Sequence, residues 1–467
     1  MKYLLGMDDY FNYYKFDFVD NPKDKYEDYF NFKEVEFEND KISSFNNMNY
    51  KINKGAYKNT LKLFFIESYK GISLQISSKD IYDQYILYEV INNKEEFICM
   101  SKDILILSDN IQEGHTYYVE AYKKYDNYYL LSNVSDNTIC KFKNINVEEP
   151  ELRILIPVYN GYKFLPRTLD SVLLSTYNKY EIFIVNDGST DGTNNVLKWY
   201  ENKYKFIRVI NNENHGVSYT RNYLLDLAKK NPTDYIAFLD ADDIVSPNMY
   251  KSLIESIKET NSDVSICKTL VRNNLDDDQY VLDVKCDKYK TYTYEDMIRE
   301  KELNSYDNIY FVALWNKVMK TDVATKYKFP ESKYYEDSAY TPLVYSYINK
   351  FVFVSDATYI WDKRKRITEG TYSTEYNKID INESVAAFFD SCIYPIDKCN
   401  EERKDYIEYS AFKDLMNYFE LIKNNKDGMY LSYKNRLIEF SKTVNGNSIY
   451  FQNDKDLLLK LSCFKNM

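Results

Sequence analysis

The chain has 467 residues, of which 44% are hydrophobic and 28% are charged, so it is long enough for two or three globular domains. Its formal net charge of −11 argues against a general nucleic-acid-binding protein, because such proteins usually carry a basic face. A bound divalent cation can reverse the sign of an acidic pocket locally, so a nucleotide ligand stays compatible with this balance.

Cysteine usage and hydropathy set the expected compartment. The seven cysteines are scattered without a Cys-x-x-Cys pair, and the two His do not complete a zinc set, so we expect reduced thiols in a cytoplasmic protein. The apolar run before Asp8 and Asp9 is too short for a secretory signal, and no stretch reaches the roughly 18 apolar residues of a membrane span. We therefore predict a soluble protein, at most peripheral to the inner face of a membrane.

Residues 1–148 predict a β-rich accessory domain. Short segments rich in β-branched and aromatic residues are separated by polar turn clusters, a pattern typical of a small β-sandwich. The expected strands are Leu61–Ile66, Ile72–Ile76, Ile104–Leu107, Tyr117–Tyr122 and Tyr128–Leu131. A polar linker that ends at Pro150 closes this region. Its sequence leaves open whether the domain binds an acceptor glycan, docks a partner or mediates oligomerisation.

Residues 151–373 change to an alternating pattern of strands and helices. The expected strands are Leu152–Val158, Tyr180–Val185, Phe206–Ile210 and Tyr235–Leu239, and apolar helical periodicity follows each of them. This alternation predicts a Rossmann-like, mostly parallel sheet with helices on both faces, in which ligands bind at the carboxyl ends of the strands. Residues 374–467 predict a C-terminal helical region.

Polar clusters follow two of these strands. After the second strand, Asn186–Gly192 is most simply explained as a turn in which Ser189, Thr190 or Asp191 caps a helix, although Asp187 could also bond a base or ribose. After the fourth strand, Asp240, Asp242 and Asp243 would repel one another unless a cation or raised pKa values relieve them. Oxygen ligands suit Mg²⁺ or Mn²⁺; the alternative is a solvated turn that caps the next helix.

These segments together resemble the family 2 glycosyltransferases with the GT-A fold. The resemblance rests on their order and spacing, and it is carried by Ile156–Asn160, Val185–Asp191, Asn214–Ser218 with Arg221 and Asn222, and Phe238–Asp243. It implies that Pro157 and Tyr159 lie at the nucleotide base and that Asp187 bonds this base, usually uracil. It further implies that Arg221 lies near the donor phosphates, that Asp240 faces ribose and metal, and that Asp242 ligates the metal. Asn186 departs from the family, in which Asp is frequent, and makes the base preference less certain.

The acceptor side carries a second resemblance. Tyr334–Ser338 is similar to the Glu-Asp element of the family, which implies Asp337 as the general base, with Glu336 in reserve. The alternative is an acidic helix start stabilised by the helix dipole. Ala313–Lys317 resembles a segment that lines the cleft, so Trp315 and Lys317 are candidate binding residues, although a Trp here more often packs. Trp361 and Arg364 lie where relatives often carry a basic residue that reaches the diphosphate, although a solvated basic run at Lys363–Arg366 is the simpler explanation. His215 could touch the donor or only shape its loop.

The resemblance implies an inverting, metal-assisted transfer by single displacement. The donor is a nucleotide sugar, with a UDP-sugar favoured, and the acceptor is a hydroxyl of a glycan, a lipid-linked molecule or a protein. Synthesis of a bacterial surface polysaccharide is the natural context by analogy. Two alternatives remain: a catalytically inactive GT-A-like protein that binds glycan or nucleotide sugar, and a nucleotidyltransferase. The latter usually carries a Gly- and Arg/Lys-rich loop after the first strand, and residues 157–164 lack one.

Overall fold

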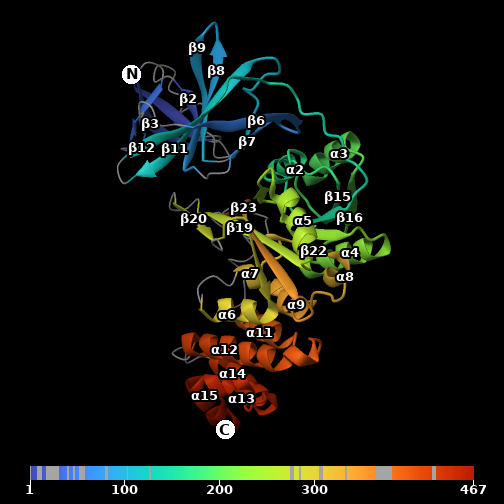
Figure 1. Cartoon of the computed structure of the whole chain (residues 1–467). Coiled ribbons are helices and arrows are strands. Elements are labelled where there is room, and N and C mark those ends of the chain that lie inside the picture. The colour runs from blue at the N-terminus through green and yellow to red at the C-terminus, as the bar shows by residue number, and fades with distance from the viewer. Residues whose placement is uncertain are drawn as a thin grey trace.

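The structure is a computed structural model of the whole chain. For residues 1–60 the description covers the backbone elements alone. The described residues are 2–7, 13–16, 31–38, 41–45, 48–51, 58–78, 82–102, 104–125, 128–273, 278–282, 286–303, 309–331, 334–363, 381–422 and 428–467. Three parts follow one another along the long axis of the molecule: a β domain at the N-terminus, an α/β part in the middle and helices at the C-terminus (Figure 1).

The N-terminal part is a sheet of thirteen strands within the described residues. They are β1 (Lys2–Met7), β2 (Tyr13–Phe16), β3 (Asn31–Glu38), β4 (Lys41–Phe45), β5 (Met48–Lys51), β6 (Lys58–Ser68), β7 (Gly71–Ser77), β8 (Gln84–Ile91), β9 (Lys94–Ser101), β10 (Leu105–Ser108), β11 (Thr116–Tyr125), β12 (Tyr128–Ser135) and β13 (Thr138–Ile139). Most neighbours pair antiparallel, as expected for strands joined without helices. Gly71 turns the chain between β6 and β7 at φ +107°, where a Cβ would lie 2.8 Å from the Ser108 carbonyl oxygen.

The central part is a ten-stranded mixed sheet flanked by helices. Its strands are β14 (Leu152–Val158), β15 (Tyr180–Asp187), β16 (Ile207–Asn212), β17 (Tyr235–Phe238), β18 (Ile244–Val245), β19 (Val264–Asn273), β20 (Asp278–Leu282), β21 (Tyr289–Thr293), β22 (Lys317–Lys320) and β23 (Lys350–Lys363). Its helices are α2 (Leu165–Leu173), α3 (Thr193–Lys203), α4 (Val217–Lys230), α5 (Met249–Thr260), α6 (Tyr294–Leu303), α7 (Ile309–Val312), α8 (Thr321–Ala324) and α9 (Glu336–Tyr345).

The expectation of a mostly parallel sheet is met only in part. Strands β16, β15, β14 and β17 are parallel neighbours, and β19 and β23 are parallel too, but β22 pairs antiparallel with both β17 and β19. Helices follow the strands up to β17, whereas β19 pairs directly with β20, the next strand in the chain, and consecutive strands of this kind pair antiparallel.

Each face of the central sheet is covered by a different end of the chain. Side chains alternate along β14, so Ile154 and Ile156 pack on one face and Leu155 packs on the other. The first face is completed by Ile66 and Leu105 of the N-terminal domain. The second face is continuous with the core of the C-terminal helices, so the three parts share their hydrophobic cores.

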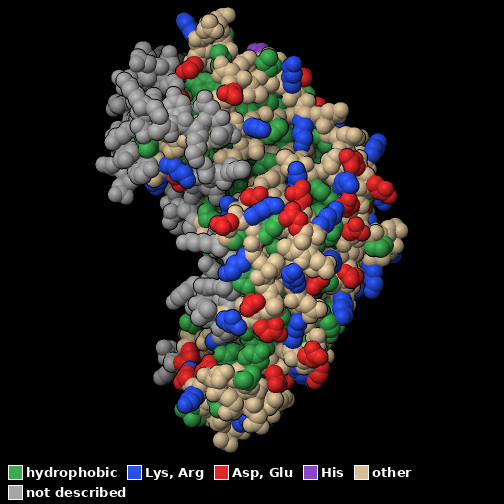
Figure 2. Space-filling model, viewed as in Figure 1, with side chains coloured by type: hydrophobic (Ala, Val, Ile, Leu, Met, Phe, Trp, Pro, Cys, Tyr) green, Lys and Arg blue, Asp and Glu red, His purple; other side chains and the backbone are tan. Residues whose placement is uncertain are grey.

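The C-terminal part is helical throughout its described elements. These are α11 (Ile381–Ile393), the 3-10 helix η3 (Glu401–Arg403), α12 (Lys404–Ile422), α13 (Gly428–Thr443), α14 (Ile449–Asn453) and α15 (Lys455–Lys465). They form the end of the molecule farthest from the N-terminal domain (Figure 1). Phe412, Leu415 and Leu437 are fully buried among them. On the face seen in Figure 2, Lys and Arg mix with Asp and Glu over the central and C-terminal parts, as on an ordinary solvated surface.

The N-terminal domain contacts the central domain through α2. Ser73 on β7 donates a 2.5 Å hydrogen bond to Oδ2 of Asp170 on α2, and Tyr200 on α3 donates to Oδ1 at 2.6 Å. Burial raises the pKa of Asp170 to about 6, although these hydroxyls oppose the shift. A buried carboxyl with donors from both domains therefore lies in their interface.

Candidate active site

The turns after β14 and β15 are joined to each other by hydrogen bonds. Asn160 lies in the left-handed region at φ 52°, accepts from the Thr190 amide at 2.8 Å, and donates its own amide to the Ser189 hydroxyl at 2.8 Å. Gly188 has φ +72°, and a Cβ there would lie 2.7 Å from the Asn214 nitrogen. Because β14 and β15 are parallel neighbours, these turns meet at one edge of the sheet, beside Pro157 and Tyr159, which are half-buried.

Asp187 fixes the turn that begins α4. Its two carboxylate oxygens accept from the backbone amides of His215 (2.9 Å) and Gly216 (2.8 Å). The Asn186 amide is also engaged inside the protein, since it donates to Asn194 and Asn211 and accepts from Ser189. The cluster after the second strand is therefore more than a helix cap, although Asp191 does accept from the Thr193 amide at the start of α3.

The three carboxylates after β17 differ in exposure. Asp242 is exposed, the side chain of Asp240 is 31% exposed, and Asp243 is buried. Burial raises the pKa of Asp240 above its ordinary value, and the charge of Asp242 adds to this effect while Arg221 opposes it. The acidic cluster thus separates into two carboxylates that reach solvent and one that is structural.

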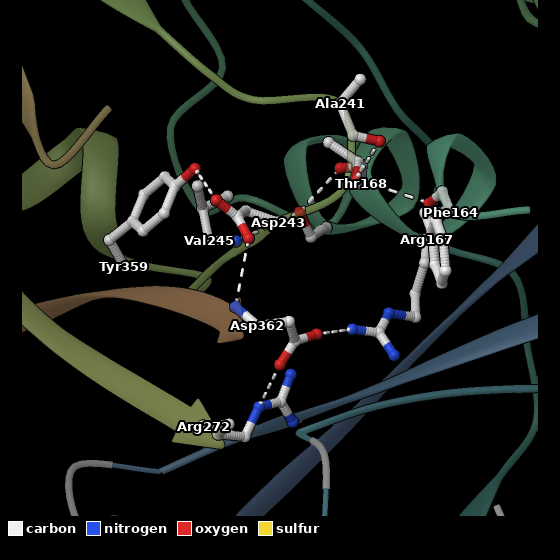
Figure 3. Close-up of polar contacts among 10 residues, drawn as sticks. Phe164, Arg167, Thr168, Ala241, Asp243, Val245, Arg272, Tyr359 and Asp362 are labelled. Carbon is white, nitrogen blue, oxygen red and sulfur yellow. Dashed lines mark hydrogen bonds and ion pairs between the residues drawn. The ribbon is translucent and has the colours of Figure 1, made fainter. Parts of the chain in front are cut away.

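Asp243 anchors this loop to β23. It accepts a hydrogen bond from the Tyr359 hydroxyl at 2.7 Å and another from the backbone amide of Asp362 at 3.2 Å (Figure 3). Asp362 in turn accepts from Arg167 Nη2 at 2.5 Å and Arg272 Nε at 2.7 Å. All three members of this ion cluster are buried, so removing one partner would leave an uncompensated charge in the interior.

Arg221 connects the donor motif to the acceptor motif. Its Nη2 donates to Asp240 Oδ1 at 3.1 Å, and its Nη1 forms an ion pair with Glu336. The arginine projects from α4, Asp240 follows β17, and Glu336 begins α9, so one buried guanidinium holds three elements together. A planar guanidinium can serve two carboxylates in this way because it offers several donors in a fixed arrangement.

Asp337 lies next to Glu336 in the first turn of α9 and is partly exposed. Burial, followed by the nearby charge of Glu336, raises the pKa of Asp337 to about 6, against the opposing effect of Arg221. A carboxyl with a pKa near the working pH suits proton transfer better than an ordinary one. Glu336 is committed to Arg221, which makes Asp337 the better placed of the two acids for this role.

The remaining predicted residues that the structure describes make packing or polar contacts within the protein. Trp315 is buried and stacks on Tyr359 with ring centroids 4.2 Å apart. Lys317 is fully buried and donates to the Tyr345 hydroxyl (2.7 Å) and the Tyr310 carbonyl (3.1 Å); burial lowers its pKa to about 7. His215 contacts the ring of Tyr219, with centroids 4.4 Å apart. Trp361 packs against Trp315, and Arg364 lies outside the described residues.

The contacts that α2 makes with the acidic loop and with β23 have no motif in the sequence. Thr168 on α2 donates a hydrogen bond to the Ala241 carbonyl at 3.0 Å, and Arg167 beside it binds Asp362 (Figure 3). A charged residue inside an apolar segment was the only available signal, as with Asp362 after Ile360 and Trp361. Such a signal marks a buried ion pair but does not identify its partner, because the partner is distant in sequence.

The geometry defines the class of this domain. It is an α/β domain in which two solvent-reaching carboxylates, one buried arginine and a carboxyl of raised pKa gather where parallel strands end. Residues 153–324 match the family model described as Glycosyl transferase family 2. This central segment is therefore similar to the family 2 glycosyltransferases, in agreement with its motifs.

Two of three similar proteins are named glycosyltransferases. Glycosyltransferase GlyA of Streptococcus pneumoniae is 27% identical over 223 residues, which cover 46% of this chain and 31% of GlyA. Glycosyltransferase GlyG of the same organism is 24% identical over 58% of this chain and 93% of GlyG. The minor teichoic acid biosynthesis protein GgaB of Bacillus subtilis is 24% identical over 57% of this chain and 29% of GgaB. The chain thus spans about a third of GlyA and of GgaB.

Among solved structures, S. aureus TarS 1–349 in complex with UDP has a TM-score of 0.48 and 21% identity, and the match covers 67% of this chain and 87% of that chain. In the part of this chain that the structure describes, no helix is both long and apolar enough to cross a membrane.

Proposed function

We propose that this protein is an inverting, nucleotide-sugar-dependent glycosyltransferase of the GT-A type, with a UDP-sugar as the favoured donor. The observation that carries the proposal is the bridge made by Arg221 between Asp240 and Glu336. This bridge places the acidic loop, where the donor diphosphate would bind, next to the carboxyl that would activate the acceptor. Transfer requires that proximity, because the acceptor oxygen must reach the anomeric carbon of the bound donor.

The acidic loop fits a divalent cation that is shared with the substrate. Among the described residues, no group of three or more His, Cys, Asp or Glu side chains could hold a metal ion by itself. Asp242 and Asp240 would supply one or two carboxylates, which is the usual contribution of a protein to Mg²⁺ or Mn²⁺ when phosphate oxygens and water supply the rest. Such a cation, when bound, would stabilise the negative charge of the departing diphosphate.

The other residues bind and orient the substrates, and one of them moves a proton. Asp337 takes the proton of the acceptor hydroxyl while that oxygen forms a bond to the anomeric carbon. The bond from this carbon to the diphosphate oxygen breaks, and the nucleoside diphosphate leaves with the electron pair. Asp187 holds the turn at His215 and Gly216 beside Pro157 and Tyr159, where we place the base. Single displacement at the carbon inverts its configuration and needs no covalent enzyme intermediate.

The acceptor and the setting belong to the same proposal. A hydroxyl of a glycan, a lipid-linked molecule or a protein is the acceptor, and a bacterial surface polysaccharide is its context. The similarity to GgaB, named for minor teichoic acid biosynthesis, supports that context. We place the reaction in the cytoplasm, at the inner face of the membrane.

Release of nucleoside diphosphate from a panel of UDP-, GDP- and dTDP-sugars, with Mn²⁺, Mg²⁺ or EDTA, tests the proposal. We expect one donor to be hydrolysed or transferred with metal only, and the NMR spectrum of the product to show the inverted anomer. Binding of a nucleotide sugar without turnover would instead indicate a catalytically inactive binding protein. Release of pyrophosphate from a nucleoside triphosphate incubated with a sugar 1-phosphate would instead indicate a nucleotidyltransferase.

A further inference from the structure

A cavity of about 460 Å³ lies between α9 and the C-terminal helices α11 and α12. Its walls come from α6, α7 and α9 of the central part and from α11 and α12 of the C-terminal part. The volume falls within the range of small-molecule sites in proteins. None of the motifs identified in the sequence lines it except the start of α9, so donor binding does not account for it.

The cavity follows α12 along almost its whole length. The residues that α12 contributes recur at helical spacing from Tyr406 to Leu421, so they form a single stripe. Fifteen residues of helix correspond to about 22 Å, and a cavity of this volume spread over that length is a slot rather than a round chamber. Leu421 is 78% exposed, so the slot reaches the protein surface near the end of α12.

The lining excludes most polar ligands. It consists mainly of aromatic and aliphatic side chains, and among the described residues that line it there is no Lys, Arg or His and one carboxylate, Asp414. A diphosphate would find no cation among these described side chains. Polar atoms are a minority of the lining, so a sugar ring enclosed there would pay a cost in free energy for each hydroxyl left unpaired. A hydrocarbon chain satisfies such walls because it has no polar group to pair.

The start of α9, which carries the proposed base, lies toward the same end of the slot as Leu421, because Tyr335 contacts Phe388 and Phe388 contacts Tyr418 of α12. Tyr335 and Ser338 both line the cavity, and they flank Glu336 and Asp337. Ser338 donates its backbone amide to Asp337 Oδ1 at 2.7 Å. The left-handed conformation of Tyr335, at φ 60°, is uncommon outside glycine, and its ring lies against Phe388 of α11 with centroids 5.5 Å apart. Asp337 is not itself among the lining residues, so a chain in the slot would hold its polar end beside the first turn of α9, which carries Asp337.

We infer that this slot binds the hydrocarbon chain of an amphipathic acceptor, whose hydroxyl is thereby delivered to Asp337. This inference rests on the proposed function, because it assigns the substrate class of the same site. The acceptor is then a lipid-linked molecule rather than a free glycan or a protein. The slot supplies affinity through the chain, and the base acts on the head group.

Alkyl glucosides test the inference because they vary chain length on one head group. Octyl β-glucoside below its micellar concentration should bind at least about ten times more tightly than methyl β-glucoside in calorimetric titrations, since each buried methylene adds affinity. Cys392→Phe fills the slot and should remove this difference, whereas Cys463→Phe, at an exposed position on α15, should keep it. Equal affinity for both glucosides, or an unchanged octyl affinity in folded Cys392→Phe, would overturn the inference.

A second measurement uses the wild-type protein, so it does not depend on whether Cys392→Phe folds. Mass spectrometry would follow modification by N-octylmaleimide and by N-methylmaleimide. Cys392 should react faster with the octyl reagent and be protected by octyl β-glucoside, while the exposed Cys463 should show neither effect. The absence of both effects at Cys392 would also overturn the inference.

The two proposals can fail separately. Release of nucleoside diphosphate from a nucleotide sugar, measured without any glucoside, reports on the proposed function alone. Turnover of a nucleotide sugar without binding of the alkyl chain would refute the lipid acceptor and support the transferase. Chain binding at Cys392 without binding or turnover of any nucleotide sugar removes the transferase and leaves a hydrocarbon site.

Discussion

The hydroxyl of Thr168 donates a 3.0 Å hydrogen bond to the carbonyl of Ala241, the residue between Asp240 and Asp242. The acidic loop is therefore fixed by two elements. Helix α2 contacts it through Thr168, and β23 contacts it through the hydrogen bond from Tyr359 to Asp243. On α2, Thr168 is two residues away from Asp170, which the N-terminal domain contacts through Ser73. Contacts on α2 thus run from the accessory domain to the proposed metal loop.

Thr168→Val should impair the donor site without disrupting the fold. Valine keeps the shape but removes the donor, so we expect the free energy of unfolding to fall by about 1 kcal/mol and the KM for the donor to rise several-fold. Steady-state kinetics and urea denaturation measure the two effects. Thr443→Val is the control, since its hydroxyl bonds Phe440 within α13, far from the loop. Equal kinetic effects of both variants would contradict the role of this contact.

Asp242→Asn should abolish metal-dependent donor binding and leave stability within about 0.5 kcal/mol, because Asp242 is exposed. The thermal shift produced by nucleotide sugar with Mn²⁺ is the readout. Asp136→Asn, an exposed position in the N-terminal domain, is the matched control and should respond like the wild type. Donor binding that persists in Asp242→Asn with undiminished metal dependence would remove Asp242 from the site.

Asp337→Asn should lower transfer by about 10²- to 10⁴-fold, the usual contribution of a general base, while donor binding persists. The wild-type rate should rise with pH through about 6 and level off above it, because only the ionised carboxyl can accept the proton. The charged groups that set this pKa are Glu336, Arg221 and Asp240, and burial is the largest influence. A rate profile that is flat between pH 5 and 8, or full activity in the variant, would assign the base elsewhere.

The same substitution should stabilise the protein at alkaline pH. The pKa of Asp337 is about 6 in the folded state against an ordinary value of 3.8, so the folded state binds the proton more tightly and the free energy of unfolding falls as pH rises between these values. Above pH 6 the buried charge imposes its full cost, and we expect Asp337→Asn to gain about 1–2 kcal/mol at pH 8 and almost nothing at pH 4. Urea denaturation at both pH values provides the measurement.

Ser73→Ala should weaken the interface between the first two domains. Asp170 loses its donor from β7, and because burial raises its pKa to about 6, the loss matters most above that pH, where the carboxyl is charged. We expect a destabilisation of about 1–3 kcal/mol at pH 8 and a smaller one at pH 4. Ser132→Ala, which removes a hydroxyl bonded to the Leu130 carbonyl, is the control. A loss that does not grow between pH 4 and pH 8 would argue against the charge on Asp170.

The strands and helices that surround the motifs could be predicted because their signals are local. Each of the four expected strands from β14 to β17 exists, since an apolar run followed by a helical period needs no distant partner to be recognised. The resemblance also indicated the candidate residues, because strand ends in a parallel sheet converge. The antiparallel pairs made by β20 and β22 were not predicted, because the direction of pairing depends on connections that composition does not specify.

The contacts that hold the candidate site could not be predicted, because they join residues far apart in the chain. Arg167 and Asp362 are 195 positions apart, and Arg221 and Glu336 are 115 apart. Neither pairing has a signature in the sequence, because a charged side chain does not identify its distant partner. The position of Lys317 illustrates the same limit: its motif suggests a cleft, yet it lies fully buried between Tyr310 and Tyr345.

Ile66 and Leu105 complete the core of the central sheet from the far side of the linker. The linker near residue 150 is therefore a poor boundary for a truncated protein, although the sequence suggests it. A fragment beginning there would expose an apolar patch and the carboxyl of Asp170, which keeps Tyr200 but loses Ser73 as a donor. The unit suited to expression and engineering therefore includes the accessory domain, and the chain is less modular than its sequence suggests.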